Sequence, residues 1–153
     1  APRTRSTTAI VIDDVARERA SASHQTLERL LAQAATVRGY APKFNANIDM
    51  FFDTPEGTVL AEIKSCNQTN LHSQVRRGVS QLLEYRYVYC AELTAPVSLL
   101  LAIETPPSVR RQWLIQYLES IAIVLAWQEQ TGGRLVTSAT IPTTLAGLLW
   151  PVH

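Results

Sequence analysis

A turn sequence between two short apolar runs most restricts how this chain can fold. Residues 48–52 and 58–65 are rich in β-branched and aromatic side chains, which is typical of strands. Thr54-Pro55-Glu56-Gly57 lies between these two runs. Proline presets φ and glycine accepts a positive φ, so this order favours a tight turn. The stretch therefore predicts a β-hairpin.

The register of this hairpin brings three charged side chains together. If Asp53 and Thr58 close the turn, Asp49 falls opposite Glu62. Glu62 and Lys64 are two residues apart on one strand, so they share a face. Charges in otherwise apolar strands are costly unless they are paired or bound to a metal. Two carboxylates can hold a divalent cation, and a lysine beside them can orient a water molecule or offset charge on a phosphate.

A long helix is expected after the hairpin. Residues 70–89 contain no proline and only one glycine. Apolar residues recur near helical spacing at Val75, Val79, Leu82, Leu83 and Val88. A second stripe, at intervals of seven and four residues, consists of Gln74, Gln81 and Tyr85. A helix packed after the hairpin can aim this second stripe at the three charged residues.

This ordered set of residues resembles the PD-(D/E)xK nuclease superfamily. The set comprises Asp49, the hairpin, Glu62-Ile63-Lys64, the helix, and Gln81-Leu82-Leu83-Glu84-Tyr85. Its Gln-x-x-x-Tyr element is similar to that of the RecB-like branch. The resemblance covers about residues 21–127, and Asp49 follows Ile48 where the superfamily motif is named for a proline. It implies an α/β fold, a restriction endonuclease-like α/β/α sandwich with a central mixed β-sheet.

The resemblance also implies a divalent-metal-dependent nuclease that hydrolyses phosphodiester bonds in DNA. Asp49 and Glu62 would bind Mg²⁺, with Mn²⁺ as a substitute, helped by the backbone carbonyl of Ile63. Lys64 would position the attacking water. Restriction, phage defence and repair are all settings that fit such an enzyme.

Residues of the second helix are expected to face the site and the nucleic acid. Gln81 would orient the lysine or a phosphate, and Tyr85 would pack or hydrogen-bond beside it. Arg76, Arg77 and Gln74 are candidates for DNA binding near the start of this helix. A helix N-terminus with nearby arginines suits phosphate, although a solvated helix face is the alternative.

The first long helix is expected over residues 22–38, capped by Ser21 or Ser23 and ended by Gly39. Its apolar stripe contains Leu27, Leu30, Leu31, Ala34 and Ala35.

Two polar residues of this first helix bear on the site. In the resembled superfamily a glutamate of the first helix often helps to hold the metal, and Glu28 is the candidate here. The alternative is an exposed ion pair of Glu28 with Arg29 or Arg38. His24 lies near the helix start, where a lone histidine is more often a capping or surface residue than a ligand.

The remaining pattern predicts further strands and one more helix. Residues 97–103 and 121–126 are continuous apolar runs, as expected of strands buried on both faces. Residues 109–120 predict a helix whose inward side chains are Trp113, Leu114, Tyr117 and Leu118. Residues 134–153 fit a last strand with a short helix, or an interface segment. This order predicts an α/β sandwich with a mixed sheet, in which right-handed crossovers make strands parallel.

Composition limits the class of protein. A chain of 153 residues with 46% hydrophobic and 18% charged residues forms one domain with a substantial core. A net charge of +1 gives no global basic field, so DNA contacts would come from a local patch, a partner subunit or another domain. The arginines available for such a patch are Arg76, Arg77, Arg110 and Arg111.

The cellular setting follows from cysteine usage and apolar run length. Cys66 and Cys90 are too few for a disulfide framework, which favours the reducing cytoplasm, with Cys66 as a structural thiol. No apolar run is long enough to cross a bilayer, and no secretory signal is visible. Residues 1–20 fit an N-terminal arm or linker with a short strand at 9–12, ahead of a nuclease-like domain at 21–153. The start at Ala-Pro-Arg fits one domain of a larger protein, and a homodimer is also open.

Three alternatives to the nuclease remain. The first is a catalytically inactive module of the same fold that binds DNA or a protein partner. The second is a phosphatase or another metal hydrolase on the same carboxylates, for which no histidine-rich ligand set is present. The third is a plain interaction module, favoured by the near-neutral charge and the apolar C-terminal segment.

Overall fold

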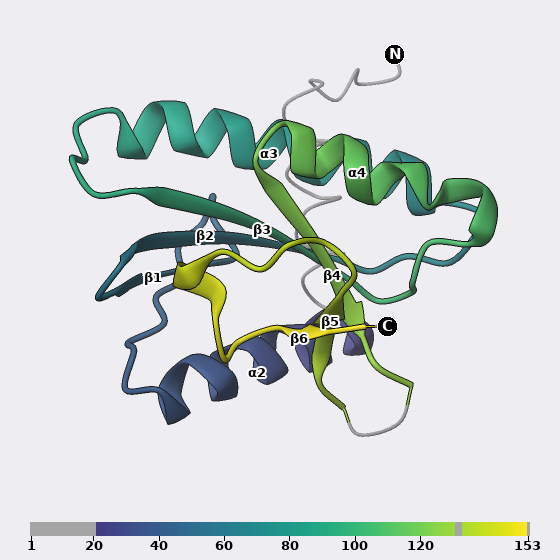
Figure 1. Cartoon of the computed structure of the whole chain (residues 1–153), viewed down its shortest axis with the longest axis horizontal. Coiled ribbons are helices and arrows are strands. Elements are labelled where there is room, and N and C mark those ends of the chain that lie inside the picture. The colour runs from purple at the N-terminus through teal and green to yellow at the C-terminus, as the bar shows by residue number, and fades with distance from the viewer. Residues whose placement is uncertain (1–20, 131–132, 153) are drawn as a thin grey trace, which may run out of the picture.

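A six-stranded mixed sheet lies between two helical layers in the computed structural model, which describes residues 21–130 and 133–152 (Figure 1). In chain order the strands are β1 (Met50–Thr54), β2 (Gly57–Lys64), β3 (Val97–Ile103), β4 (Ile123–Gln128), β5 (Leu135–Thr137) and β6 (Trp150–Pro151). The same order runs across the sheet. The pairs β2–β3, β3–β4 and β5–β6 are parallel, and the pairs β1–β2 and β4–β5 are antiparallel. The prediction of an α/β sandwich with a mixed sheet is confirmed.

In the part of the chain that the structure describes, three α-helices cover the two faces of the sheet. Helix α2 (Ala22–Val37) lies on one face, and α3 (Leu71–Cys90) and α4 (Trp113–Ser120) lie on the other (Figure 1). Two short 3-10 turns, η1 (Val109–Arg111) and η2 (Thr143–Leu145), complete the elements of the described residues. The predicted arm at residues 1–20, its short strand included, lies outside the described residues.

The hairpin has the register expected from the sequence. Asp53 pairs with Thr58 and Thr54 pairs with Gly57, so Pro55 and Glu56 form the turn. Gly57 has a φ of 149°, and a Cβ there would run into the backbone oxygen of Pro96. A side chain at this position would therefore push β2 away from the segment that leads into β3.

Each face of the sheet has its own hydrophobic core because side chains alternate along a strand. Leu60 of β2 belongs to one core, together with Val75 and Leu82 of α3 and Leu114 of α4. Val59, Ala61 and Ile63 of the same strand belong to the other core, together with Leu27, Leu31 and Ala35 of α2 and with Leu145, Leu148 and Leu149. Glu62 and Lys64 alternate with the second set, so they lie on the α3 side of the sheet.

Some sequence expectations were wrong at the edges of elements. Val88 is 59% exposed rather than part of the apolar stripe, because the buried side of α3 ends instead on Cys90. The expected helix over 109–120 is divided into η1 and α4, and the strand expected to begin at Ile121 begins at Ile123. Within α4, Leu114 and Leu118 face inward with Ile115.

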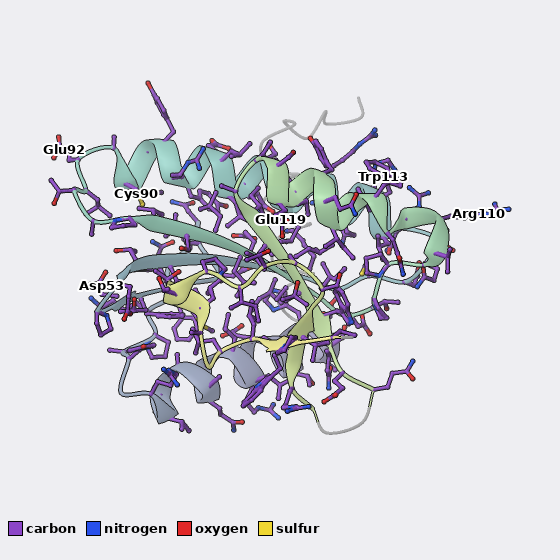
Figure 2. All side chains as sticks on the ribbon, viewed as in Figure 1. Asp53, Cys90, Glu92, Arg110, Trp113 and Glu119 are labelled. Carbon is purple, nitrogen blue, oxygen red and sulfur yellow. The ribbon has the colours of Figure 1, made fainter. Side chains whose placement is uncertain are left out.

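Trp113 and Tyr117 were expected inside the protein, but they lie at its surface. Their exposed fractions are 49% and 48%. With only eight residues, α4 buries one narrow stripe, and the aliphatic side chains fill it. Figure 2 shows Trp113 at the outer surface of the α3–α4 layer.

Membrane association through a spanning helix finds no support in the described part of the chain, where no helix combines the necessary length and apolar character.

Candidate functional site

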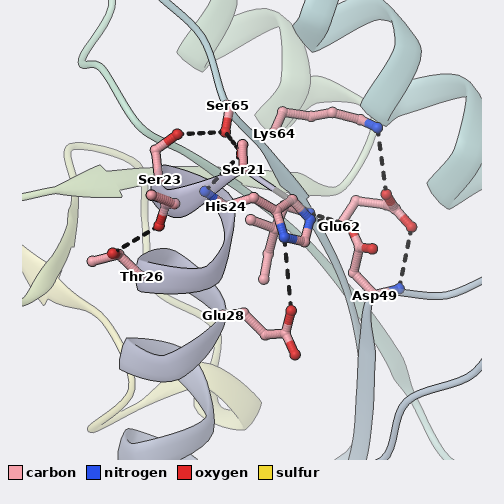
Figure 3. A network of polar contacts seen from close by, with 11 residues as sticks. Ser21, Ser23, His24, Thr26, Glu28, Asp49, Glu62, Lys64 and Ser65 are labelled. Atoms are coloured by element: carbon pink, nitrogen blue, oxygen red, sulfur yellow. Dashed lines mark hydrogen bonds and ion pairs between the residues drawn. The ribbon is translucent and has the colours of Figure 1, made fainter. Parts of the chain in front are cut away.

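Asp49, Glu62 and Lys64 meet inside the protein at one end of the hairpin (Figure 3). They are 6%, 1% and 2% exposed. Asp49 directly precedes β1, and continuing the strand register places it opposite Glu62. The structure therefore brings together the three charged residues that the hairpin register predicts.

Asp49 is bound to β2 by two reciprocal hydrogen bonds. The backbone N–H of Ile63 donates to Asp49 Oδ2 over 2.9 Å. The backbone N–H of Asp49 donates to Glu62 Oε1 over 3.4 Å. The N–H and C=O groups of one strand residue point toward the same neighbouring strand, so the Ile63 carbonyl points toward this edge as well.

Lys64 completes the charged cluster on the α3 side of the sheet. Its Nζ atom lies 3.7 Å from Glu62 Oε2, an ion pair between two almost fully buried side chains of one strand. A buried charge is tolerated only when it is paired and hydrogen-bonded. The pair therefore offsets part of the cost of placing either group in the core.

The two carboxyl groups have pKa values that move in opposite directions. Burial, and then the neighbouring Asp49 carboxylate, raise the pKa of Glu62 to about 9, and the Lys64 ammonium opposes this shift only in part. Burial also acts to raise the pKa of Asp49. Hydrogen bonds with His24, Glu62 and the Ile63 N–H outweigh it, so that pKa lies well below its usual range. Of the two carboxyl groups, Asp49 therefore holds the negative charge more readily and Glu62 holds a proton more readily.

His24 also belongs to this cluster, although its position there was not predicted from the sequence. The residue is 1% exposed, and its Nε2 atom lies 3.4 Å from Asp49 Oδ2. The expectation of a capping or surface histidine was wrong. The signal was present in the sequence, because His24 continues the buried stripe of Leu27, Leu31 and Ala35 at helical spacing.

Glu28 reaches the cluster through His24. Its Oε2 atom lies 3.7 Å from His24 Nδ1, and the Glu28 side chain is 35% exposed. Figure 3 shows Glu28, His24 and Asp49 in a row from α2 to the sheet. Glu28 is therefore next to the candidate site, and its contact is with His24 rather than with Arg29 or Arg38, the alternative considered from the sequence.

A set of hydroxyl groups fixes α2 against the end of β2. Ser21 caps the helix by accepting a hydrogen bond from the His24 N–H. The Ser65 hydroxyl, one residue after Lys64, is hydrogen-bonded to the hydroxyls of Ser21 and Ser23 at 2.9 and 2.7 Å. These contacts place the first turn of α2, and His24 with it, beside the charged cluster.

The stripe of α3 that carries Gln74, Gln81 and Tyr85 faces the sheet. Gln74 Nε2 donates to the Ser65 carbonyl over 2.8 Å. Gly78 lies on the same stripe and packs so closely on Leu101 that a Cβ would come within 2.5 Å of its Cδ1 atom. Tyr85 packs against the α3-side core.

Ideal helix and strand dimensions place Gln81 about level with Glu62 along the sheet. It lies seven residues after Gln74, about 10.5 Å along the helix. Glu62 lies three residues before Ser65, about 10 Å along the strand, and α3 runs opposite to β2 because it connects two parallel strands. Gln81 Oε1 is buried and has no hydrogen-bond partner. An orphaned acceptor at this level suits a cation, a water molecule or the ammonium group of Lys64.

Arg76 and Arg77, the other candidates on α3, are exposed. At about 100° per residue, Arg77 lies about 40° around the helix from Gln81, whereas Arg76 lies about 140° from it, on the side that lines the space between α3 and α4. Arg77 is thus nearer than Arg76 to the side of α3 that carries Gln81.

The residues fit a divalent cation by charge, although they do not form a finished site. Within residues 21–130 and 133–152, no three His, Cys, Asp or Glu side chains converge as a metal-binding group. The expected ligands here are two carboxylates and a backbone carbonyl, so they include only two such side chains. Burial and the Asp49 carboxylate raise the pKa of Glu62, and a cation bound to the two carboxylates would favour its ionised form.

Comparisons of the chain with protein-family models, with curated proteins and with solved structures found no match. The residues and their geometry alone therefore bear on function.

Proposed function

We propose that this protein is a divalent-metal-dependent DNA nuclease. One observation carries the proposal: two acids and a lysine, from β2 and from the residue that precedes β1, are buried together. A structural ion pair needs only one acid and one base. A second buried acid is instead expected where the two carboxylates bind a cation. The motif resemblance to PD-(D/E)xK nucleases supplies the choice of DNA as substrate.

Each residue of the cluster has a chemical role in this proposal. Asp49 and Glu62, with the Ile63 carbonyl, would hold Mg²⁺ or Mn²⁺, which supplies charge stabilisation to the phosphate undergoing hydrolysis. Lys64 holds the attacking water and balances negative charge in the transition state. Gln81 orients the lysine or a phosphate oxygen, and Tyr85 packs beside it.

His24 and Glu28 support this arrangement from α2. His24 holds the Asp49 carboxylate in place through the 3.4 Å contact. Its imidazole is also chemically able to join the cation ligands, and Glu28 offers a partly exposed carboxylate next to it. The free, buried cysteines Cys66 and Cys90 fit the cytoplasmic setting expected from the sequence.

A catalytically inactive module of the same fold is the second candidate. It is favoured by the burial of all three charged side chains, each at most 6% exposed. In that case the cluster would be structural, and the protein would bind DNA or a protein partner without hydrolysis.

A cleavage assay separates these two candidates. Plasmid, linear duplex and single-stranded DNA are incubated with the protein in Mg²⁺, Mn²⁺ or EDTA. The nuclease is expected to cut at least one substrate with Mg²⁺ or Mn²⁺ and none in EDTA, and Asp49→Asn to cut none. Lys43→Ala, a change at an exposed lysine, is the control and should cut like the wild type. Absence of metal-dependent cleavage on all three substrates would reject the enzyme and leave the inactive module.

A further inference from the structure

A groove between α3 and α4 lies on the outer side of the α3 layer. Its volume is about 290 Å³, and its lining residues include His72, Val79, Trp113 and Tyr117. The His72 and Trp113 rings meet edge to face with centroids 5.5 Å apart. The Trp113 and Tyr117 rings are 6.1 Å apart. Half-exposed rings on two helices thus form an aromatic wall that the core does not use.

The charge around this groove is positive. Arg76 lines it, and no acidic side chain does among the described residues. Arg76 and Arg111 are both close enough to lower the pKa of His72, after desolvation as the first cause. Aromatic faces beside guanidinium groups complement a ligand that is both planar and anionic.

We propose that this groove binds unpaired nucleotides of a DNA strand, with bases against Trp113 and Tyr117 and phosphates on Arg76 and Arg111. Stacking on exposed aromatic rings needs a base with a free face, which single-stranded DNA offers and a duplex does not. Arginine can contact phosphate through two parallel hydrogen bonds. The choice of DNA rests on the proposed nuclease function, and the groove adds a single-stranded substrate class to it.

Helix α3 lies between the groove and the charged cluster. His72 and Arg76 are on the outer side of α3, whereas Gln74 and Gln81 on the same helix face the sheet. An α-helix with its side chains is about 10–12 Å across. A strand held in the groove therefore needs only a few nucleotides to pass the flank with Arg77 and reach the cluster.

Direct binding tests the groove without relying on catalysis. A fluorescent oligothymidylate about ten nucleotides long is titrated in EDTA, and its anisotropy gives Kd. Trp113→Ala and Tyr117→Ala are each expected to weaken binding about 10-fold, and Trp113→Phe to restore most of it. Arg76→Ala with Arg111→Ala should make the dependence of log K on log salt shallower by about 0.7 for each phosphate that is no longer neutralised.

The chain offers a matched control on another surface. Trp150 is 43% exposed and has the Arg134 guanidinium 4.8 Å above its ring. It therefore combines an exposed aromatic ring with a guanidinium, as the groove does, but outside the groove. Trp150→Ala should leave Kd unchanged. A duplex of matched sequence should bind more weakly than the single strand.

Three results would contradict the proposal that single-stranded DNA binds in this groove. One is unchanged affinity in both aromatic variants with circular dichroism like that of the wild type. A second is equal loss of affinity with Trp150→Ala. The third is displacement of the oligonucleotide by polyglutamate at equal charge concentration, which would mean an acidic protein partner instead. If the oligonucleotide binds in the groove but no DNA is cleaved, the nuclease proposal is rejected and the proposed binding site is kept. If DNA is cleaved but binding does not depend on the groove residues, the binding site is rejected and the nuclease proposal is kept.

Discussion

The Nζ atom of Lys64 lies 3.7 Å from Oε2 of Glu62, and both side chains are almost fully buried on the same face of β2. Glu62 is also the hydrogen-bond acceptor for the Asp49 N–H. One carboxyl group thus joins the positive charge of the cluster to its second acid. The proposed cation and the lysine act on the same group, and substitutions can separate their roles.

Glu62→Gln and Lys64→Ala should affect metal binding and cleavage differently. Without the Glu62 carboxylate, too few anionic oxygens remain to compete with the hydration of Mg²⁺, so both binding and cleavage should be lost. Lys64→Ala should keep or tighten metal binding, because a nearby positive charge is removed, and should lower the cleavage rate about 10²–10³-fold. Titration calorimetry with Mn²⁺ and a plasmid-nicking assay measure the two effects. Equal loss of Mn²⁺ binding in both variants would contradict this division of roles.

The stability of the metal-free protein should fall as the pH rises from about 5 to about 9. The pKa of Glu62 is about 9 in the folded protein and has an ordinary value of 4.5. Between these values the folded protein holds a proton that the unfolded chain releases. The stabilisation is therefore complete below pH 4.5 and is lost as the pH rises toward 9. Urea unfolding in EDTA at several pH values measures the trend.

The Glu62→Gln variant isolates this effect, because glutamine does not titrate. Its free energy of unfolding should vary less with pH than that of the wild type over the same range. Mn²⁺ should oppose the loss of stability at high pH, since only the ionised carboxylate binds the metal. Parallel pH profiles for wild type and variant would rule out the raised pKa of Glu62 as the cause.

His24→Ala should lower the free energy of unfolding by about 2 kcal/mol, because the buried Asp49 carboxylate loses a hydrogen-bonding partner. Glu28→Ala should cost less, since the Glu28 side chain is 35% exposed and lies 3.7 Å from the imidazole. Urea unfolding at pH 7 compares the two variants. A larger loss in Glu28→Ala would show that the row of contacts is anchored from its exposed end.

Gln81→Leu should leave stability unchanged or raise it by about 1 kcal/mol, because it removes a buried acceptor without a hydrogen-bond partner. Cleavage should nevertheless fall, since Gln81 is proposed to orient Lys64 or a phosphate. Gln74→Leu is the matched control on the same stripe. It should lose about 1 kcal/mol with its 2.8 Å bond to Ser65. Thermal denaturation and the nicking assay are run on both variants. An unchanged cleavage rate in Gln81→Leu would mean that Gln81 has only a structural role.

Local patterns were enough to predict the hairpin, its register and the elements around it. The turn at Pro55 and Glu56 sets the pairing of Asp53 with Thr58, and that pairing decides which strand residues oppose one another. The strand at Val97–Ile103 and its parallel pairing follow from an apolar run that contains one serine, and from the helix before it. These features depend on residues close together in sequence.

The sequence by itself determined that Asp49, Glu62 and Lys64 meet, because strand alternation and one turn fix their positions relative to one another. Only the tertiary structure decided that His24 joins them and that Trp113 stays outside. His24 is 25 residues from Asp49, and their contact requires α2 to dock on the sheet through Ser21, Ser23 and Ser65. Trp113 satisfies a helical apolar pattern as well as Leu114 does, and the choice between them depends on which side of a short helix finds space in the core. Packing between distant segments sets that space, and no local pattern encodes it.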